Sequence, residues 1–165
     1  MTTVNIIDAN SQHFKEILDI MNYEILNKTS LYDYNERTIN DLENIYESKK
    51  QKNFPFIVAI ENEKVIGYAY YDLYNPKQGY LHTVEHSIYL KNGNEGKGVG
   101  KLLMNQLIAK AKMQNIKTMI ALIDNENAES ILFHEKYNFV TVGVMKQVGF
   151  KFNRWLDCRI MQIIL

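Results

Sequence analysis

The chain has 165 residues, 46% of them hydrophobic, and its 19 basic residues balance 19 acidic ones. We therefore expect one compact globular domain that spans residues 1–165. The balanced charge gives no sign of a polyanionic partner, so we expect no nucleic-acid partner. The first residues do not resemble a signal peptide and the apolar runs are too short to cross a bilayer. We expect a cytoplasmic protein with no membrane partner.

The cysteine and histidine content gives no indication of a cross-link or a metal centre. Cys158 is the single cysteine, so no internal disulfide can form. The four histidines show no spacing with a cysteine that is typical of a zinc site, and we expect no metal.

Hydrophobic spacing predicts alternating strands and helices. The first half predicts a strand, two helices and a hairpin, over residues 4–7, 11–26, 35–49, 56–60 and 64–74. The second half predicts a strand, a helix, a strand, a helix and two strands, over residues 83–90, 101–114, 118–123, 127–137, 139–146 and 155–164. Asn127 can cap the helix whose third position is Ser130. This order favours one mixed α/β sheet.

A glycine-rich turn joins the strand over 83–90 to the helix that follows. Gly96, Gly98 and Gly100 remove Cβ atoms where backbone N–H groups point outward at a helix N-terminus, which suits a pyrophosphate. The turn is not a Walker A motif, because Gly98 follows Lys97, and not the dinucleotide fingerprint, because Lys101 replaces its last glycine. On its own, the turn is equally compatible with a purely structural role.

Several segments resemble the GNAT superfamily of N-acetyltransferases, and within it the phosphinothricin acetyltransferase family. The glycine turn is similar to the superfamily's acetyl-CoA loop, and residues 83–89 resemble the family's T-V-E-x-S-V-Y strand. Further similar segments follow the family's order along nearly the whole chain, at residues 22–27, 32–38, 127–136 and 148–157.

This resemblance implies a GNAT-type mixed sheet, splayed at its centre and flanked by helices on both faces. We expect the strands over 83–90 and 118–123 to run parallel and to separate, leaving a wedge for pantetheine. The implied activity is transfer of an acetyl group from acetyl-CoA to a small amino-acid-like amine. Phosphinothricin, methionine sulfoximine or sulfone, or a related α-amino acid are the expected acceptors. The resemblance also implies a homodimer, for which the aromatic and basic residues of 149–157 suit an interface.

Glu85 is the candidate general base, because the resemblance assigns that role to the glutamate of T-V-E. Its neighbours in the strand include Val84 and Ile88, and an apolar setting raises the basicity of a carboxylate. From the residues alone, an ordinary solvent-facing strand glutamate is the more common interpretation.

His134 is the candidate acid at the thiolate, because the phosphinothricin branch has histidine where many superfamily members have tyrosine. An imidazolium can donate a proton near neutral pH, since its unperturbed pKa is about 6.5. A histidine that only hydrogen-bonds a backbone carbonyl is the alternative.

The cofactor is expected to bind mainly to backbone. The candidate contacts are the strand edge, the loop and the later helix cap: Ser87, Ile88, Tyr89, Leu90, Glu95, Gly96, Lys97, Gly98, Val99, Gly100, Lys101 and Asn127. The strand edge can pair with the amides of pantetheine like an added strand. Glu95 departs from the family, which usually has arginine or glutamine there. A carboxylate repels phosphate, so Lys97 and Lys101 would have to compensate.

The acceptor site is less well defined by the sequence. The candidates, with Glu85, are Tyr34, Lys77, Tyr80 and Lys151. The family carries two arginines before T-V-E where this chain has Asn75 and Lys77, so a bidentate grip on an anionic group is lost or moved. Two other functions stay open: acetylation of a different amine (a polyamine, an aminoglycoside or a protein N-terminus), and non-catalytic acyl-CoA binding.

Overall fold

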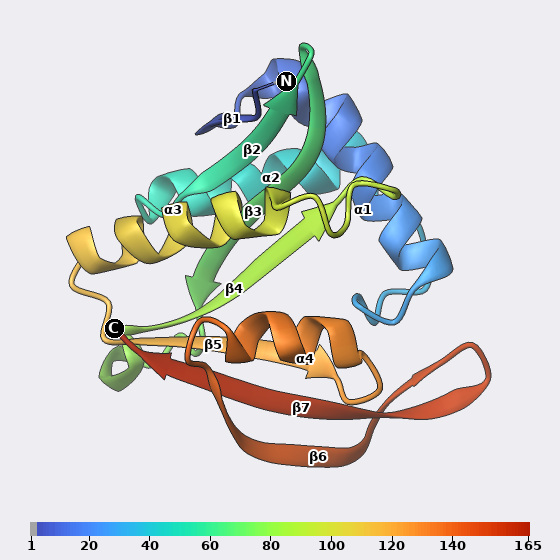
Figure 1. Ribbon diagram of the computed structural model, residues 1–165, viewed down its shortest axis with the longest axis vertical. Coiled ribbons are helices and arrows are strands. Elements are labelled where there is room, and N and C mark those ends of the chain that lie inside the picture. The colour runs from blue at the N-terminus through green and yellow to red at the C-terminus, as the bar shows by residue number, and fades with distance from the viewer. Residues whose placement is uncertain (1–2) are drawn as a thin grey trace.

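The computed structural model describes residues 3–165, so Met1 and Thr2 of the segment inspected for a signal peptide lie outside it. Its centre is a seven-stranded mixed sheet in the order β1-β2-β3-β4-β5-β7-β6 (Figure 1). The strands are β1 (Asn5–Asp8), β2 (Phe56–Glu61), β3 (Lys64–Leu73), β4 (Thr83–Leu90), β5 (Thr118–Asp124), β6 (Val140–Lys151) and β7 (Arg154–Ile164). This confirms the mixed α/β sheet predicted from the sequence.

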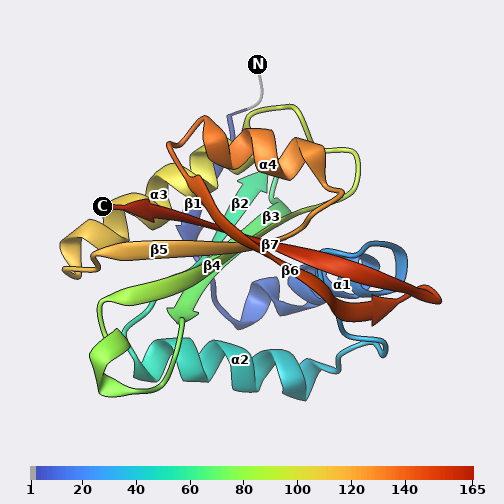
Figure 2. The ribbon, with the colours of Figure 1, turned by 90° about the horizontal axis from the view of Figure 1, so that it is seen from below.

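Helices cover both faces of the sheet (Figure 2). The helices are α1 (Phe14–Asn27), α2 (Ile39–Gln51), α3 (Val99–Met113) and α4 (Ala128–Glu135), with short 3-10 turns at Ser11–His13 and Gln78–Tyr80. Helices α1 and α2 cover one face, and α3 and α4 cover the other. The apolar residues of α1 and α2 belong to one hydrophobic cluster, and those of α3 and α4 belong to a second. Because side chains alternate along a strand, neighbouring residues of β4 face different helix layers.

Two hydrophobic cores hold these layers together. The core on the α3 face contains Leu103 and Leu107 of α3 and Val84 of β4, all fully buried. The core on the α1 face contains Ile17 of α1 and Leu42 of α2, packed under β2 and β3. The apolar periodicity of the helices therefore identified the buried faces correctly.

Capping explains where two helices begin. The Thr38 side chain accepts the N–H of Asp41 and the Asp41 carboxylate accepts the N–H of Thr38, so α2 begins at Ile39. The predicted start at residue 35 was therefore wrong, because this box outweighed the apolar spacing. Asn127 accepts the N–H of Ser130 at 3.0 Å, which confirms the predicted cap of α4.

Three further predicted boundaries differ in ways that the local backbone explains, and the remaining differences are of one or two residues. Residues 11–13 form a 3-10 turn rather than the start of α1. Helix α3 begins at Val99, two residues before the predicted start, because Gly98 adopts the left-handed conformation that precedes its first turn. Strand β6 continues to Lys151 beyond the predicted end at 146, through register irregularities that the alternation pattern does not reveal.

The parallel strands β4 and β5 separate at the centre of the sheet. Their ladder has three residue pairs, the last of which is Glu85 with Ile120. Beyond this pair the remaining residues of β4, up to Leu90, leave β5, as Figure 1 shows. The expected parallel and splayed arrangement is confirmed, and it places an opening beside Glu85.

Candidate active site

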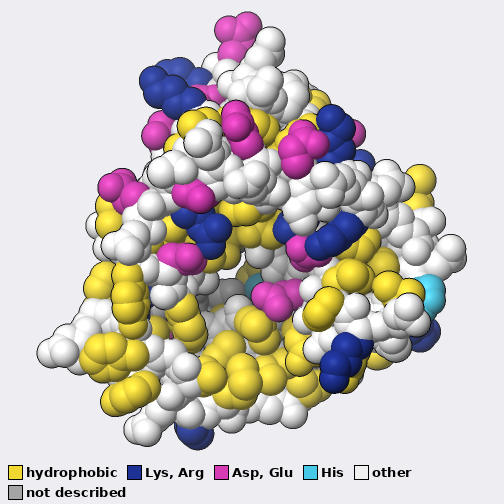
Figure 3. Space-filling model, turned by 180° about the vertical axis from the view of Figure 1, so that it is seen from behind, with side chains coloured by type: hydrophobic (Ala, Val, Ile, Leu, Met, Phe, Trp, Pro, Cys, Tyr) yellow, Lys and Arg dark blue, Asp and Glu magenta, His cyan; other side chains and the backbone are white. Residues whose placement is uncertain are grey.

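A cleft of about 1080 Å³ lies where β4 and β5 separate. It is lined by β4 beyond Glu85, the C-terminal half of β5, the glycine loop, the end of α1 and both halves of α4. Figure 3 shows the hollow near the middle of one face, rimmed by hydrophobic and charged side chains. Pockets for small ligands have volumes of about 300–1000 Å³, so this cleft has room for a coenzyme-sized molecule.

Most expected cofactor contacts line this cleft. They are Ser87, Ile88, Tyr89, Leu90, Glu95, Gly96, Gly98, Gly100, Lys101 and Asn127, together with His134. Val99 is 2% exposed and packs in the core of the α3 face instead. Lys97 is exposed and does not line the cleft.

The glycine loop has the backbone geometry of an anion cradle. Gly96 and Gly98 have φ values of +73° and +85°, which other residues rarely adopt, and a Cβ at either would meet no atom within 4 Å. Gly98 is the N-cap of α3 and offers no side chain to the N–H groups of the first turn. These donors and the open space above them fit the pyrophosphate of a coenzyme.

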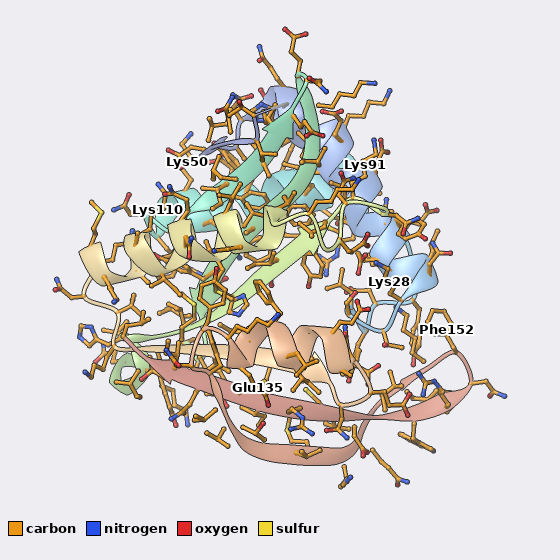
Figure 4. All side chains as sticks on the ribbon, viewed as in Figure 1. Lys28, Lys50, Lys91, Lys110, Glu135 and Phe152 are labelled. Carbon is orange, nitrogen blue, oxygen red and sulfur yellow. The ribbon has the colours of Figure 1, made fainter. Side chains whose placement is uncertain are left out.

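Glu95 is paired rather than left facing this cradle. Its Oε1 lies 3.3 Å from the Nζ of Lys28, and its Oε2 accepts the N–H of Gly93 at 2.7 Å. Lys28 was not expected at the site, because it lies 67 positions away in the sequence. Figure 4 shows Lys28 at the end of α1.

Glu85 lies opposite another carboxylate, Asp72 of β3. Burial, and then the nearby negative charge of Asp72, raise the pKa of Glu85 above its ordinary value. Asp72 is itself held by Lys49 at 2.6 Å and Lys52 at 2.8 Å, both from the C-terminal end of α2. Burial acts to raise the pKa of Asp72, but these hydrogen bonds outweigh it and lower the pKa below its ordinary value. A raised pKa suits Glu85 to accept a proton near neutral pH.

His134 is buried and stacks on a second histidine, His86 of β4. The two Nε2 atoms are 3.0 Å apart, and the Nδ1 of His134 lies 2.6 Å from the carbonyl oxygen of Ser130. Since that carbonyl only accepts, the neutral His134 holds its proton on Nδ1 and its Nε2 accepts the N–H of His86. Burial lowers the pKa of His134, although the hydrogen bond to Ser130 acts to raise it. Burial lowers the pKa of His86 to about 3. The imidazolium on which the expected acid role depended is therefore disfavoured.

The expected acceptor residues do not gather in the cleft. Lys151 is 3% exposed, and its Nζ donates to the carbonyl oxygens of Lys28 and Leu31 at 2.7 and 2.5 Å. The Tyr34 hydroxyl donates to the carbonyl oxygen of Phe150. These two side chains tie the segment after α1 to the end of β6.

Lys77 and Tyr80 lie in the turn that leads into β4. The Tyr80 ring packs against that of Tyr74 with centroids 5.9 Å apart. Because β4 begins at Thr83, this turn is at the Glu85 end of the strand, whereas the glycine loop follows its other end.

Several residues that line the cleft were not identified from the sequence. They are Glu24, Lys28, Thr29, Ser30, His86 and Asp124, with Phe152 from the β6–β7 turn and Arg154 at the start of β7. Their common feature is that they come from segments far apart in the chain. His86, Phe152 and Arg154 lie at variable positions of segments that resemble the family, and nothing in the sequence connected His86 to His134.

A protein-family model described as an acetyltransferase (GNAT) domain matches residues 6–160. The chain belongs to the GNAT acetyltransferases. An L-methionine sulfoximine/L-methionine sulfone acetyltransferase of Pseudomonas paraeruginosa is 35% identical over 164 residues, which cover 99% of this chain and 95% of that protein. The resemblance inferred from the motifs is thereby confirmed.

Two solved structures of acetyltransferases are closely similar to this one. An N-acetyltransferase from Staphylococcus aureus has a TM-score of 0.96 and 35% identity, with 98% of each chain covered. A phosphinothricin acetyltransferase from Sinorhizobium meliloti in complex with acetyl-CoA has a TM-score of 0.95 and 32% identity, covering 99% of this chain and 89% of that one. The GNAT fold expected from the sequence is confirmed.

Two further observations concern residues 3–165 only. None of their helices is long and apolar enough to cross a membrane. Their histidine, cysteine and carboxylate side chains form no group of three that could hold a metal ion.

Proposed function

We propose that this acetyltransferase transfers an acetyl group from acetyl-CoA to the amino group of a small α-amino-acid-like acceptor. Phosphinothricin, methionine sulfoximine and methionine sulfone are the first compounds to test, because relatives that cover most of the chain are named for them. The observation that carries the proposal is the separation of β4 from β5 directly after Glu85. A carboxylate with a raised pKa therefore directly precedes the residues of β4 that line a coenzyme-sized cleft.

The residues of the loop and the free strand edge are suited to hold acetyl-CoA. The N–H groups of residues 96–101 would bind its pyrophosphate, and β4 from Ser87 to Leu90 would pair with its pantetheine amides. Asn127 already caps α4, and its side chain lines the same cleft. Bound acetyl-CoA supplies the activated acetyl thioester.

Glu85 is proposed to take the proton from the acceptor's ammonium, directly or through a water molecule. Its side chain is on the face covered by α1 and α2, beside Asp72, whereas His86 and His134 are on the α3 and α4 face. The gap between the strands connects these faces, so an amine activated on one face can reach an acetyl group held from the other. Most of the acceleration would come from this positioning and from general-base catalysis.

His134 is proposed to line the thiol end of the cleft and to assist proton return to the thiolate. It must first gain a proton, because the neutral ring donates its N–H to Ser130. A thiolate is a competent leaving group that water can also protonate, so we expect a smaller contribution from His134 than from Glu85.

The acceptor's anionic group is proposed to be held near the Glu85 end of β4. Lys77 and Tyr80 belong to the turn that enters this end. Lys151 makes two hydrogen bonds to backbone carbonyls, and we propose that it shapes the site through the segment after α1.

We further propose that the chain is one catalytic domain that acts in the cytoplasm as a homodimer. Cys158 is a free, buried thiol, which fits a reducing compartment. The exposed apolar side chains of β6 and β7, including Phe150 and Trp155, fit an interface between two copies.

A thiol-release assay with acetyl-CoA and a panel of amines tests the proposal. We expect turnover with the three amino-acid analogues and little with polyamines or aminoglycosides. Turnover with polyamines alone would favour a different acceptor class. Acetyl-CoA binding without turnover on any amine would favour the non-catalytic alternative.

A further inference from the structure

Glu95 places a negative charge beside the loop that is suited to a pyrophosphate. Its carboxylate is held by the Lys28 ammonium at 3.3 Å and by the N–H of Gly93 at 2.7 Å. Neither partner belongs to residues 96–101. The carboxylate is therefore directed to the end of α1 and leaves the N–H groups of the cradle unused.

Lys28 is held in place by contacts that do not depend on Glu95. Its Nζ lies 2.8 Å from the Oε1 of Glu24, a carboxylate that is 4% exposed and also accepts the Ser30 hydroxyl. Its carbonyl oxygen accepts the Nζ of Lys151. Side chain and backbone are thus both anchored, so neutralising Glu95 would leave Lys28 at the mouth of the cleft.

We infer that Lys28 is a cofactor-binding residue, whose ammonium offsets the negative charge that Glu95 brings beside the coenzyme phosphates. This inference rests on the proposed function, because the ligand is a coenzyme A phosphate. Lys28, Glu95 and Gly96 line one cleft, so their charges act on the same ligand. Partly exposed charges a few ångströms apart change affinity by about five- to tenfold at low ionic strength.

Calorimetric titration with coenzyme A at low ionic strength tests how the charges of Lys28 and Glu95 affect the dissociation constant. Wild type is compared with Glu95→Gln, Lys28→Met and the double variant. With Lys28 present, we expect Glu95→Gln to tighten coenzyme A binding by about fivefold, because Lys28 stays in place when the negative charge is removed. Lys28→Met should weaken binding by about tenfold, and adding Glu95→Gln should recover about fivefold of that loss. Lys28→Met also removes the ion-pair partner of Glu24. The single and the double variant share this loss, so it cancels when their dissociation constants are compared.

Lys110→Met is the matched control. Lys110 pairs with Asp8 at 3.1 Å and is 34% exposed, close to the 37% of Lys28, but it lies outside the cleft. Its loss should leave the coenzyme A dissociation constant unchanged. The effects of Lys28→Met and Glu95→Gln should both shrink in about 1 M NaCl, where the Debye length is about 3 Å.

Two results would overturn the inference while leaving the function intact: an unchanged dissociation constant in Lys28→Met, or no gain of affinity when Glu95→Gln is added to Lys28→Met. A wild-type protein that binds no coenzyme A would overturn the proposed function itself. Thermal unfolding of the ligand-free variants identifies any loss that comes from misfolding.

Discussion

Glu85 and His134 face different layers of the molecule, and their substitutions should have unequal effects. We expect Glu85→Gln to leave acetyl-CoA affinity nearly intact and to lower turnover by about 10²–10⁴-fold, with loss of the acidic limb of the pH–rate profile. His134→Ala should cost less, because water can protonate the thiolate. Steady-state kinetics and calorimetry on both variants measure this ordering. If Glu85→Gln stays active and His134→Ala is inactive, the two roles are reversed.

Asp72 is expected to set the pH at which Glu85 works. Burial and the Asp72 charge raise the pKa of Glu85, so catalysis by its ionised form is lost as the pH falls through that raised value. Asp72→Asn removes one cause and leaves Lys49 and Lys52 unpaired, and both changes favour the carboxylate. The acidic limb should therefore move to lower pH.

A pH–rate profile of Asp72→Asn measures this shift. Asp8→Asn is the control, since Asp8 also pairs with a lysine but lies on β1, which does not neighbour β4 in the sheet. An acidic limb that stays in place in Asp72→Asn, or that moves equally in Asp8→Asn, would contradict the role of Asp72.

The buried pair of His86 and His134 should make folding sensitive to mild acid. Burial lowers the pKa values of both histidines in the folded protein, that of His86 to about 3. In the unfolded chain each histidine has a pKa of about 6.5, so below that pH the unfolded chain binds more protons than the folded protein. This contribution to stability is present above about pH 6.5 and is lost as the pH falls, by up to about 1.4 kcal/mol per pH unit for each histidine.

Urea unfolding at pH 7 and pH 5 measures the effect. In His86→Gln the difference between the two unfolding free energies should be smaller than in wild type. An equal difference would mean that other groups account for the acid sensitivity.

At the scale of elements, the glycine loop gives a pair of matched substitutions. Gly98→Val and Gly93→Val meet similar backbone strain, because φ is +85° and +84°, and neither Cβ would touch an atom within 4 Å. Both should lose about 1–2 kcal/mol of stability. Only Gly98→Val should weaken acetyl-CoA binding, because Gly98 lies at the N-terminus of α3. Equal dissociation constants for the two variants, measured by calorimetry, would reject the loop as the phosphate site.

Local patterns were sufficient to predict the elements that build the cleft. The order of β4, glycine loop and α3, and the Asn127 cap, depend on residues close together in the chain. The histidine pair, the Lys28 contact and the Asp72 ion pairs join residues 48, 67 and 23 positions apart. No short-range pattern contains such pairs. Lys151 shows the same limit, since a lysine in a strand gives no sign that backbone carbonyls will surround it.

At the scale of the whole molecule, the exposed residues of β6 and β7 predict self-association. Phe150 and Trp155 pack together with centroids 5.0 Å apart while remaining 40% and 61% exposed. Sedimentation velocity at micromolar concentration should give twice the 19.3 kDa mass of one chain. Trp155→Glu should produce the monomer, whereas Leu132→Glu, at a similarly exposed position on α4, should not. A wild-type protein that sediments as one chain would contradict the dimer.

The two hydrogen bonds of Lys151 determine when, during translation, the segment after α1 can be anchored. They join Lys151 to carbonyl groups 123 and 120 positions earlier, so the segment after α1, which lines the cleft, is anchored by one of the last segments to be made. At translation rates of about 5–20 residues per second, Lys151 is made roughly 6–25 s after Lys28. A nascent chain should therefore acquire coenzyme A affinity only after residue 151 has emerged. Arrested ribosomes carrying chains of increasing length would show this as an abrupt gain of binding.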